Sequence, residues 1–368
     1  MSEKGSARSS NRRLIRTRAD SQLTSYTIAT IEGDGVGPEV SAVSIGVLNS
    51  LAPQFDLRFD FRAAPVGDSC KRTSGEALPS TSVSTIMQTD ACLKAPVGET
   101  AAETIVKLRQ ILDLYANIRP SKSLPHVPSL LPDIDLVIVR ENTECLYRGM
   151  EFEIEGGVIA LRTITRKASE RIAKYAFQMA ELRNGKRRVV SVHKSNVLRK
   201  SDGLFAQVCR EVSSNYPSIA YSEMLVDAAA MNLIREPQNF DVLVTTNMYG
   251  DILSDEAAQV VGGLGTAPSA NIGERFALFE PVHGAAPDIA GRGTANPIAM
   301  ILTSAMMLEW LSKSRGDRSC EDAATAIRKA VNLTLEKGVR TPDLGGVSST
   351  AEVGSAVTRF VAAQAITK

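Results

Sequence analysis

The sequence lacks the marks of a membrane protein and of a disulfide-rich protein. Among its 368 residues, no apolar run approaches the ~20 residues that a membrane-spanning helix needs. The cysteines are odd in number, lie far apart and form no CxxC pair: they are Cys70, Cys92, Cys145, Cys209 and Cys320. This pattern argues against a disulfide framework or a zinc site. It favours free thiols in a reducing compartment, so we expect a cytoplasmic protein.

The chain also lacks the excess of positive charge that nucleic-acid-binding proteins carry, since its formal net charge is +1. Its first twenty residues hold six basic and two acidic side chains, which leaves the rest slightly negative. We predict a disordered basic tail over residues 1–24, because this segment has too few aliphatic and aromatic residues to fold. A targeting peptide, a binding role and a start-site artefact are the alternatives.

What the sequence has is the composition of a globular protein, with 43% hydrophobic and 23% charged residues. A chain of this length is too long for one ordinary hydrophobic core, so we expect two domains. Apolar residues at helical spacing predict helices over residues 40–51, 100–114, 167–182, 298–313 and 320–336, the last two amphipathic.

The stretch from Phe240 to Pro297 carries the strongest chemical pattern. An apolar strand is followed by polar residues, and at Gly250 the chain turns into a predicted helix. Asp251 and Asp255 then lie four residues apart on one helix face and repel each other unless a cation lies between them. A hard divalent ion such as Mg²⁺ suits such a pair. The alternative is that Asp251 only caps the helix and Asp255 is a solvated surface charge.

The segment after this helix is rich in glycine and small residues. His283, Gly284 and Gly291 surround Asp288, so backbone amides can approach a phosphate and a carboxylate can accept ribose hydroxyls. Together, NMYGDILSDEAA and EPVHGAAPDIAGRGTANP resemble the signature of the metal-dependent, decarboxylating β-hydroxyacid dehydrogenases, which act on isocitrate, homoisocitrate or 3-isopropylmalate. The resemblance extends from about Tyr26 to the end of the chain.

This resemblance implies an isocitrate/isopropylmalate dehydrogenase-like fold with two α/β domains around a central cleft. Residues 25–114 and 262–368 would form a discontinuous cofactor-binding domain, and residues 115–261 a substrate and dimerisation domain with an arm near 150–165. The glycine turn GDGVGP has the spacing GxGxG rather than GxGxxG, and no acidic residue follows at the distance that a Rossmann site needs. We therefore expect a non-Rossmann cofactor site.

Three arginines stand at the ends of apolar segments: Arg109, Arg119 and Arg140. Arginine pairs bidentately with carboxylates, so a convergent set suits a substrate with more than one acid group. By resemblance these arginines hold the substrate's carboxylates, and Tyr147 acts in acid–base chemistry. The sequence departs from the family at Cys145, where we expect glycine or an acid.

Lys194 follows a buried strand, a position from which it can act as a base. The resemblance implies that Lys194 and Asp227 both reach the active site of the neighbouring subunit in a homodimer. Asp227 would be catalytic and would also join Asp251 and Asp255 as the third ligand of Mg²⁺ or Mn²⁺.

The resemblance assigns cofactor contacts to His283, Gly284, Ala286, Asp288 and Asn296. The carboxylate of Asp288 favours the free 2′-hydroxyl of NAD and repels the 2′-phosphate of NADP, so NAD is the expected cofactor. Asn296 is expected near the adenine.

The substrate's C3 group is expected to face the helix before Arg109, where Glu103, Ile105 and Val106 stand. A negative or apolar lining suits an isopropyl group better than a third carboxylate. The sequence thus predicts oxidative decarboxylation of 3-isopropylmalate, a step of leucine biosynthesis, and is most similar to the archaeal type. An NAD-dependent isocitrate or homoisocitrate dehydrogenase is the alternative, and a non-catalytic regulatory subunit is a minor one. In another reading, Ile105 and Val106 face the core.

Overall fold

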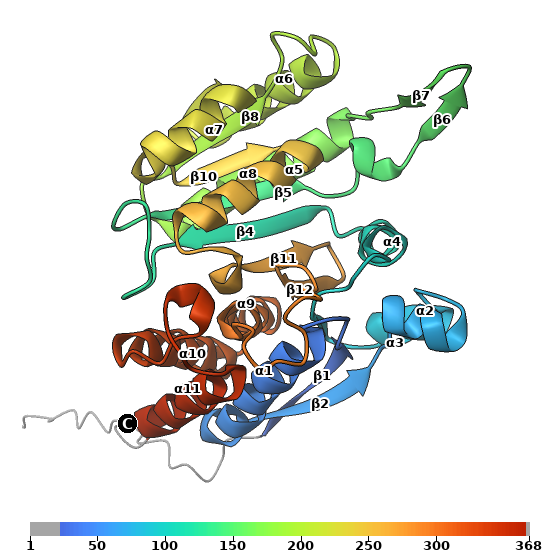
Figure 1. Ribbon diagram of the computed structural model, residues 1–368. Helices are drawn as coiled ribbons and strands as arrows, with labels where there is room; N and C mark the ends of the chain where they lie inside the picture. The colour runs from blue at the N-terminus through green and yellow to red at the C-terminus, as the bar shows by residue number, and fades with distance from the viewer. Residues whose placement is uncertain (1–22, 366–368) are drawn as a thin grey trace, which may run out of the picture.

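A computed structural model describes residues 23–365 of the protein (Figure 1). The predicted tail over residues 1–24 lies almost entirely outside the described residues. The fold is α/β, and its main sheet has ten strands in the order β2-β1-β3-β12-β11-β4-β5-β10-β8-β9. Their bounds are β1 Thr24–Ile31, β2 Leu57–Ala63, β3 Ala91–Lys94, β4 Ala116–Lys122, β5 Asp135–Glu141, β8 Arg188–His193, β9 Ala220–Leu225, β10 Val242–Thr245, β11 Pro268–Ile272 and β12 Ala277–Pro281.

The sheet is parallel toward both edges and antiparallel at its centre. Strand β11 runs antiparallel to both β12 and β4, and β4 runs antiparallel to β5. The boundary between the two predicted domains falls between β4 and β11, where Ile118 pairs with Ala270. The sheet crosses this boundary without a break, so the domain bounds stay a prediction.

Helices cover both faces of the sheet (Figure 1). Four of the predicted helices are confirmed with small shifts at their ends, as α1, α5, α9 and α10. The helices are α1 Gly37–Leu51, α2 Asp68–Ser74, α3 Ser80–Met87, α4 Lys107–Ile111, α5 Arg166–Arg183, α6 Ser201–Ser213, α7 Val226–Arg235, α8 Asn247–Val260, α9 Ile298–Arg315, α10 Arg318–Glu336 and α11 Thr350–Ala365. None of the helices in the described part of the chain is long and apolar enough to cross a membrane.

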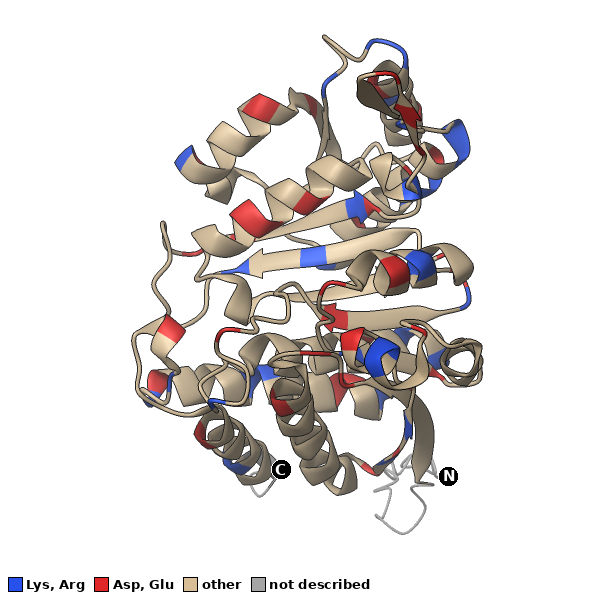
Figure 2. Cartoon of the chain, turned by 45° about the vertical axis from the view of Figure 1, so that its right-hand side comes forward, with Lys and Arg blue, Asp and Glu red and all other residues tan. Residues whose placement is uncertain are grey.

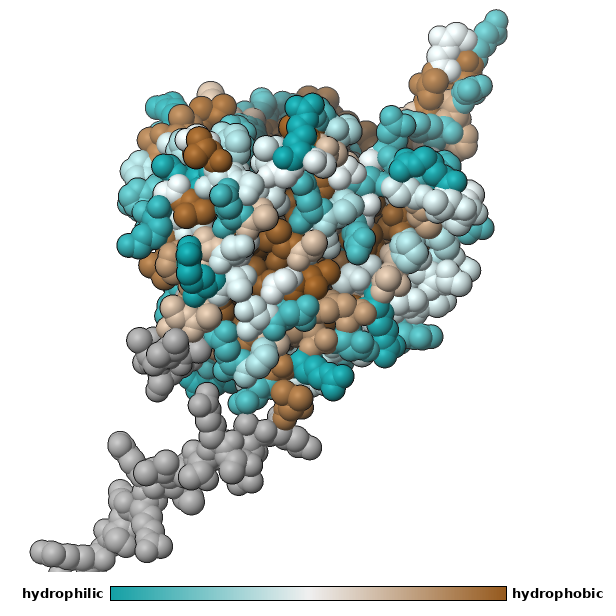
Figure 3. Space-filling model, turned by 60° about the horizontal axis from the view of Figure 1, so that its bottom comes forward, coloured by the Kyte–Doolittle hydropathy of each residue, from teal (hydrophilic) through white to brown (hydrophobic). Residues whose placement is uncertain are grey.

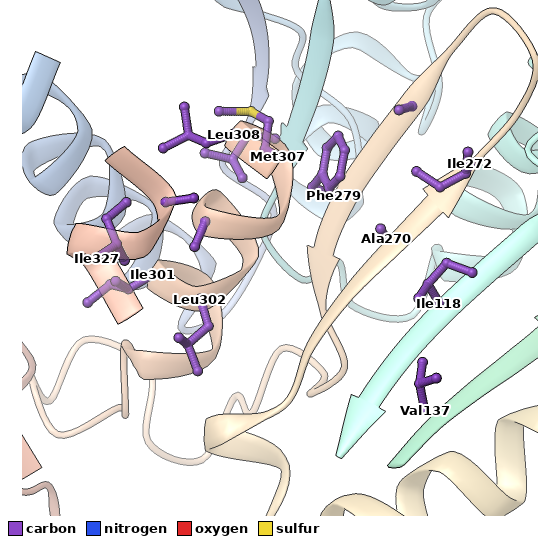
Figure 4. Packing of buried hydrophobic residues seen from close by; sticks show 14 of the residues in the cluster. Ile118, Val137, Ala270, Ile272, Phe279, Ile301, Leu302, Met307, Leu308 and Ile327 are labelled. Atoms are coloured by element: carbon purple, nitrogen blue, oxygen red, sulfur yellow. The ribbon is translucent and has the colours of Figure 1, made fainter. Parts of the chain in front are cut away.

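Helix α9 is not the amphipathic helix that was predicted. Its side chains are buried on nearly every side, because it lies between the sheet and helices α1 and α10. Figure 4 shows Leu302, Met307 and Leu308 of α9 between Ile327 of α10 and Phe279 of β12. A helix surrounded by other elements carries no polar face to mark it.

Helix α11 was missed altogether by the sequence analysis. Its buried residues Val353, Ala356, Val357 and Val361 have helical spacing but are small, so the signal is weak. The helix packs closely against α1, where Gly354 approaches the side chain of Val43.

The predicted helix over residues 100–114 is present, but it ends earlier and contains a π turn. The chain makes a π turn at Ala102–Val106 and only then the short α-helix α4. Asp68 holds the start of this segment by accepting hydrogen bonds from the backbone N–H of Glu99 and Thr100 and from the Thr100 hydroxyl. A π turn adds one residue to a helical turn, which apolar spacing alone does not reveal.

At the predicted arm near residues 150–165, the chain forms a two-stranded hairpin, β6 Glu151–Ile154 paired with β7 Gly157–Ala160. The arm projects from the body in Figure 1 and carries hydrophobic residues on its surface in Figure 3. Phe152, Ile154 and Val158 are all more than half exposed. Its pairing with a second subunit stays a prediction.

Candidate active site

Three buried arginines from different elements form the centre of the site. Arg109 lies on α4, Arg119 on β4 and Arg140 on β5, and their exposed fractions are 6%, 7% and 1%. Burial, reinforced by the positive charges of Arg119 and Arg109, lowers the pKa of Arg140 to about 9. Buried cations so close together need anions, and the chain supplies some of them.

Two of these anions come from helix α8. Asp251 Oδ1 lies 2.5 Å from Arg140 Nη1 and 3.1 Å from Arg119 Nη2, and Asp255 Oδ1 lies 3.0 Å from Arg119 Nη1. Figure 2 shows acidic residues of α8 beside basic residues of the sheet. The predicted pair on one helix face is confirmed, but the helix begins at Asn247 and contains Gly250, which was expected to be the turn before it.

The two carboxylates differ in their environment. Burial raises the pKa of Asp251, but Arg140 and Arg119 outweigh it and hold the value below the usual range. The pKa of Asp255 is raised by burial and by the negative charge of Asp251, against the opposing effect of Arg119. Asp255 therefore carries a negative charge that the arginines do not fully compensate. Two carboxylates of this kind are a donor set that fits a hard divalent cation.

Tyr147 lies in the same cluster, on the 3₁₀ turn Leu146–Arg148. Its hydroxyl donates a short hydrogen bond to Asp251 Oδ2, and the Arg140 guanidinium lies 4.9 Å from the centroid of its ring. Burial raises the pKa of Tyr147; Arg140 opposes this and Asp251 adds to it, for a net rise. The phenol is therefore protonated at neutral pH and can donate a proton.

Lys194 and Asp227 are together, but apart from this cluster. Lys194 follows β8, Asp227 is the second residue of α7, and Lys194 Nζ lies 2.8 Å from Asp227 Oδ1. The Asp227 side chain is 64% exposed. Within residues 23–365, no three His, Cys, Asp or Glu side chains are grouped closely enough to hold a metal ion. One chain thus brings Asp251 and Asp255 together without Asp227, and the meeting of all three stays a prediction for the dimer.

The predicted cofactor residues form the loop that follows β12. The GDGVGP turn supports this loop: Val36 N–H donates to Ala285 O at 2.8 Å, and a Cβ on Gly35 would lie 1.9 Å from the same oxygen. Ala286 has a positive φ of 40°. The glycines of the turn therefore serve close packing against this loop.

Polar groups of this loop fit a nucleotide. His283 Nε2 is buried and has no hydrogen-bond partner within the described residues, and burial lowers the pKa of His283, so the ring is neutral. Gly284 and Asp288 are exposed, and their backbone and carboxylate can be reached. Asn296 is buried; its amide donates to Asp343 at 2.9 Å and accepts from Ile298 N–H at the start of α9.

Glu280, which the sequence analysis missed, connects the cofactor loop with the arginines. It is the fourth residue of β12, directly before Pro281, and pairs with Lys94 Nζ at 2.7 Å and Arg109 Nη2 at 3.1 Å. Lys94 and Arg109 hold the pKa of Glu280 at about 2 although burial raises it. A lysine and a glutamate, each near the end of an apolar strand, were the signal that could have revealed this pair.

The residues expected to line the C3 pocket differ in how far they are exposed and in whether they are paired. Ile105 is 7% exposed and packs with Leu108 and Leu112 in the hydrophobic core, so the alternative that it faces the core is the one observed. Val106 is partly exposed. Glu103 is paired with Lys71 at 2.7 Å, so it does not give the lining an uncompensated negative charge.

Comparisons with known proteins agree with this architecture. A family model described as isocitrate/isopropylmalate dehydrogenase matches residues 27–357. The 3-isopropylmalate dehydrogenase of Methanothermobacter thermautotrophicus is 50% identical over 339 residues, which cover 92% of this chain and 99% of the relative. The homoisocitrate dehydrogenase of Methanocaldococcus jannaschii is 43% identical over 352 residues, covering 91% of this chain and 97% of the relative.

Among solved structures, the crystal structure of isocitrate dehydrogenase from Methylococcus capsulatus matches with a TM-score of 0.84 and 40% identity. The match covers 91% of this chain and 99% of that one. The expected fold and the expected similarity to archaeal 3-isopropylmalate dehydrogenases are thus confirmed, and the protein belongs to the isocitrate/isopropylmalate dehydrogenase family of decarboxylating dehydrogenases.

Proposed function

We propose that this protein is an NAD-dependent 3-isopropylmalate dehydrogenase that produces 4-methyl-2-oxopentanoate for leucine biosynthesis. The observation that carries the proposal is the contact of Arg119, Arg140 and Tyr147 with Asp251, beside the buried Arg109. It places carboxylate-binding groups, a cation-binding acid and a proton donor within one set of contacts. The higher identity to the 3-isopropylmalate enzyme than to the homoisocitrate enzyme supports the choice of substrate.

Asp251 and Asp255 of one subunit, with Asp227 of the other, would hold Mg²⁺ or Mn²⁺. When bound, this cation acidifies a coordinated hydroxyl and stabilises the negative charge that develops on the substrate. NAD, held by the loop that follows β12, would take up the hydride from C2. The five free cysteines, all buried, suit a reducing compartment, which supports the cytoplasm as the place of the reaction.

The chain's own groups bind and orient the substrate and move protons. The arginine guanidiniums hold the two carboxylates of the malate core, since each can form bidentate bonds. Lys194, or a water that it orients, removes the proton of the C2 hydroxyl. After loss of carbon dioxide, the protonated phenol of Tyr147 delivers a proton to C3.

Exposed groups of the single chain support a homodimer. The arm exposes Phe152, Ile154 and Val158, and Asp227 stands near the surface with Lys194. A partner that covers the arm would bury these apolar groups and bring Lys194 and Asp227 to the other subunit's arginine cluster. Each active site would then contain residues of both chains.

NAD is favoured over NADP because the exposed Asp288 has no cation within the described residues that would neutralise it. Its carboxylate accepts a ribose hydroxyl and repels a 2′-phosphate. His283, Gly284 and Ala286 would contact the cofactor from the same loop, and the Asn296 backbone would stand near the adenine.

The alternative substrates, isocitrate and homoisocitrate, carry a third carboxylate. Two residues at the expected lining supply no free cation for it, because Lys71 is engaged by Glu103 and Val106 is apolar. Purified protein should therefore show the highest kcat/KM with 3-isopropylmalate among the three acids. A preference for a tricarboxylate would overturn the substrate assignment. No turnover with any of them, despite intact folding, would favour a non-catalytic subunit.

A further inference from the structure

Arg162, the second residue after the arm strand β7, links four segments of the chain. Its side chain is 13% exposed and forms an ion pair with Asp202. Its Nε donates to the sulfur of Cys145 at 3.2 Å, and Nη2 donates to Thr246 Oγ1 at 3.0 Å. The guanidinium also lies 5.0 Å from the ring centroid of Tyr249 on α8. One planar group thus fixes the base of the arm to three other segments.

The contact with Asp202 leads to Lys194. Asp202 lies on α6 and is fully buried. One of its oxygens pairs with Arg162, and the other accepts the backbone N–H of Lys194 at 2.6 Å. A buried carboxylate with both oxygens engaged cannot move without exposing an unpaired charge. Arg162 therefore holds the backbone of Lys194 through Asp202.

The contact with Cys145 leads to Tyr147, two residues further on. Cys145 is fully buried and has φ 71° and ψ −150°, a backbone conformation that residues other than glycine rarely adopt. Such a conformation persists only when its surroundings hold it. Here Thr163 O accepts the backbone N–H of Cys145 at 2.9 Å, and Arg162 binds its sulfur.

We infer that Arg162 is a positioning residue for both acid–base groups, Tyr147 through Cys145 and Lys194 through Asp202. The inference rests on the proposed function, in which Tyr147 serves the active site of its own subunit and Lys194 serves that of the partner. A single guanidinium at the base of the arm thus adjusts both active sites of the dimer.

Two variants separate these effects. Arg162→Lys keeps a positive charge beside Asp202 but loses the fork that reaches Cys145 and Thr246, so it should impair the step that uses Tyr147. Asp202→Asn keeps the sulfur contact but removes the charged acceptor of the Lys194 N–H, so it should impair the step that uses Lys194. Displacement of a catalytic group by a fraction of an ångström to an ångström lowers kcat by roughly ten- to hundredfold.

Each homodimeric variant should show this loss in kcat with little change in KM. The solvent deuterium isotope effect on kcat should increase, because proton transfer becomes the slow step. Arg166→Lys is the matched control: Arg166 pairs with Glu211 at 2.5 Å on the surface, near the other end of α6 from Asp202, and this exposed pair takes no part in the contacts of Arg162. It should leave turnover unchanged. Thermal unfolding and size-exclusion chromatography establish that each variant is a folded dimer.

Hybrid dimers with one tag per subunit give the decisive result. With Arg162→Lys on one subunit and Asp202→Asn on the other, both defects fall in one active site, and about half of the activity should persist. With both changes on one subunit beside a wild-type partner, each site carries one defect, and activity should fall to about a tenth or less. If Arg162→Lys does not fold, Cys145→Ala replaces it, because it removes only the sulfur contact.

Equal activity of the two hybrids, or an unchanged isotope effect, would overturn the positioning role. The reverse order of the two hybrids would support positioning but show that Tyr147 and Lys194 of one chain share a site, against the proposed dimer. Failure of the proposed function is recognised separately: Lys194→Met and Tyr147→Phe would then retain full turnover.

Discussion

Gly250 of α8 faces the side chain of Arg140 so closely that a Cβ on the glycine would lie 2.5 Å from Arg140 Cγ and 2.7 Å from its Cβ. The arginine passes over the helix at the position without a side chain. There, its guanidinium donates to Asn247 Oδ1 through Nε at 3.0 Å and Nη2 at 2.7 Å and meets Asp251 on the same helix. The helix is thus recessed at the point where Arg140, which we propose to bind the substrate, crosses it.

Gly250→Ala is expected to impair substrate binding although alanine favours helices. The methyl group would collide with the stem of Arg140 near its backbone, which cannot rotate away, so Arg140 or α8 must shift. We expect KM for the hydroxy acid to rise about tenfold or more. The overpacking should cost about 1–3 kcal/mol of stability, more than the roughly 1 kcal/mol that alanine gains over glycine in a helix.

Gly46→Ala is the matched control for this change. Gly46 lies within α1, and a Cβ there would meet nothing within 4 Å. This variant should be more stable by about 0.5–1 kcal/mol with unchanged kinetics. Steady-state kinetics and denaturant unfolding of the two variants measure both effects. Equal KM values for Gly250→Ala and the wild type would show that Arg140 has room to move.

At position 145, we expect the glycine variant to be more stable than the alanine variant, although alanine is normally the more favourable residue. Both Cys145→Ala and Cys145→Gly lose the sulfur contact with Arg162, but only glycine adopts φ 71° and ψ −150° without strain. In the alanine variant, backbone strain of this kind costs about 1–3 kcal/mol of stability. The glycine variant avoids the strain but lacks the buried methyl group of alanine, which costs it about 1 kcal/mol. Denaturant unfolding should therefore show the glycine variant to be the more stable of the two. A more stable alanine variant would contradict the strain.

Much of the site could be predicted because its residues stand where a regular element ends. Arg140, Lys194 and the acids of α8 follow or interrupt apolar runs. The spacing of apolar residues is enough to predict the helices and strands around them. Gly250 was misplaced because glycine normally marks a turn, whereas here it admits a side chain from another strand. Such a requirement comes from tertiary packing, which local sequence does not encode.

The residues that hold the arginines in place were not predictable in the same way. Glu280 and Asp202 are buried carboxylates whose partners are distant in sequence; Arg109 is 171 positions from Glu280. A single acid within an apolar strand predicts that a cationic partner exists, but it does not indicate which residue that partner is. Likewise, Ile105 matches a helix period but is turned into the core by the π turn.

Glu280 should make the protein sensitive to acid in a defined pH range. Its pKa is about 2 in the folded protein and near 4.5 when unpaired, so the folded state binds this proton only at a lower pH than the unfolded state does. The stabilisation is fully present above pH 4.5 and is lost as the pH falls from 4.5 to about 2. A shift of this size corresponds to about 3 kcal/mol.

Glu280→Gln tests this contribution. The variant leaves Lys94 and Arg109 without their carboxylate, so its free energy of unfolding at pH 7 should be lower by about 3 kcal/mol. Its stability should also fall less steeply than that of the wild type between pH 4.5 and 2. Denaturant unfolding across this range measures both. Glu309→Gln removes the exposed partner of Arg328 and should change neither quantity measurably. Parallel pH profiles for wild type and Glu280→Gln would contradict the assignment.

Removal of divalent cations should stop turnover without unfolding the protein. Asp251 and Asp255 keep Arg119 and Arg140 as ion-pair partners when no cation is bound, so the fold does not depend on the cation to hold the two acids. Dialysis against a chelator should abolish activity, and Mg²⁺ or Mn²⁺ should restore it. Because a cation that binds only the folded state stabilises it by mass action, its addition should also raise Tm.

Asp255→Asn should need at least about tenfold more cation for half-maximal activity, since it removes a charged ligand. It should keep its fold, because the Asp255 side chain is 51% exposed. Full activity after exhaustive chelation, with residual metal excluded by elemental analysis, would contradict the role given to the two acids.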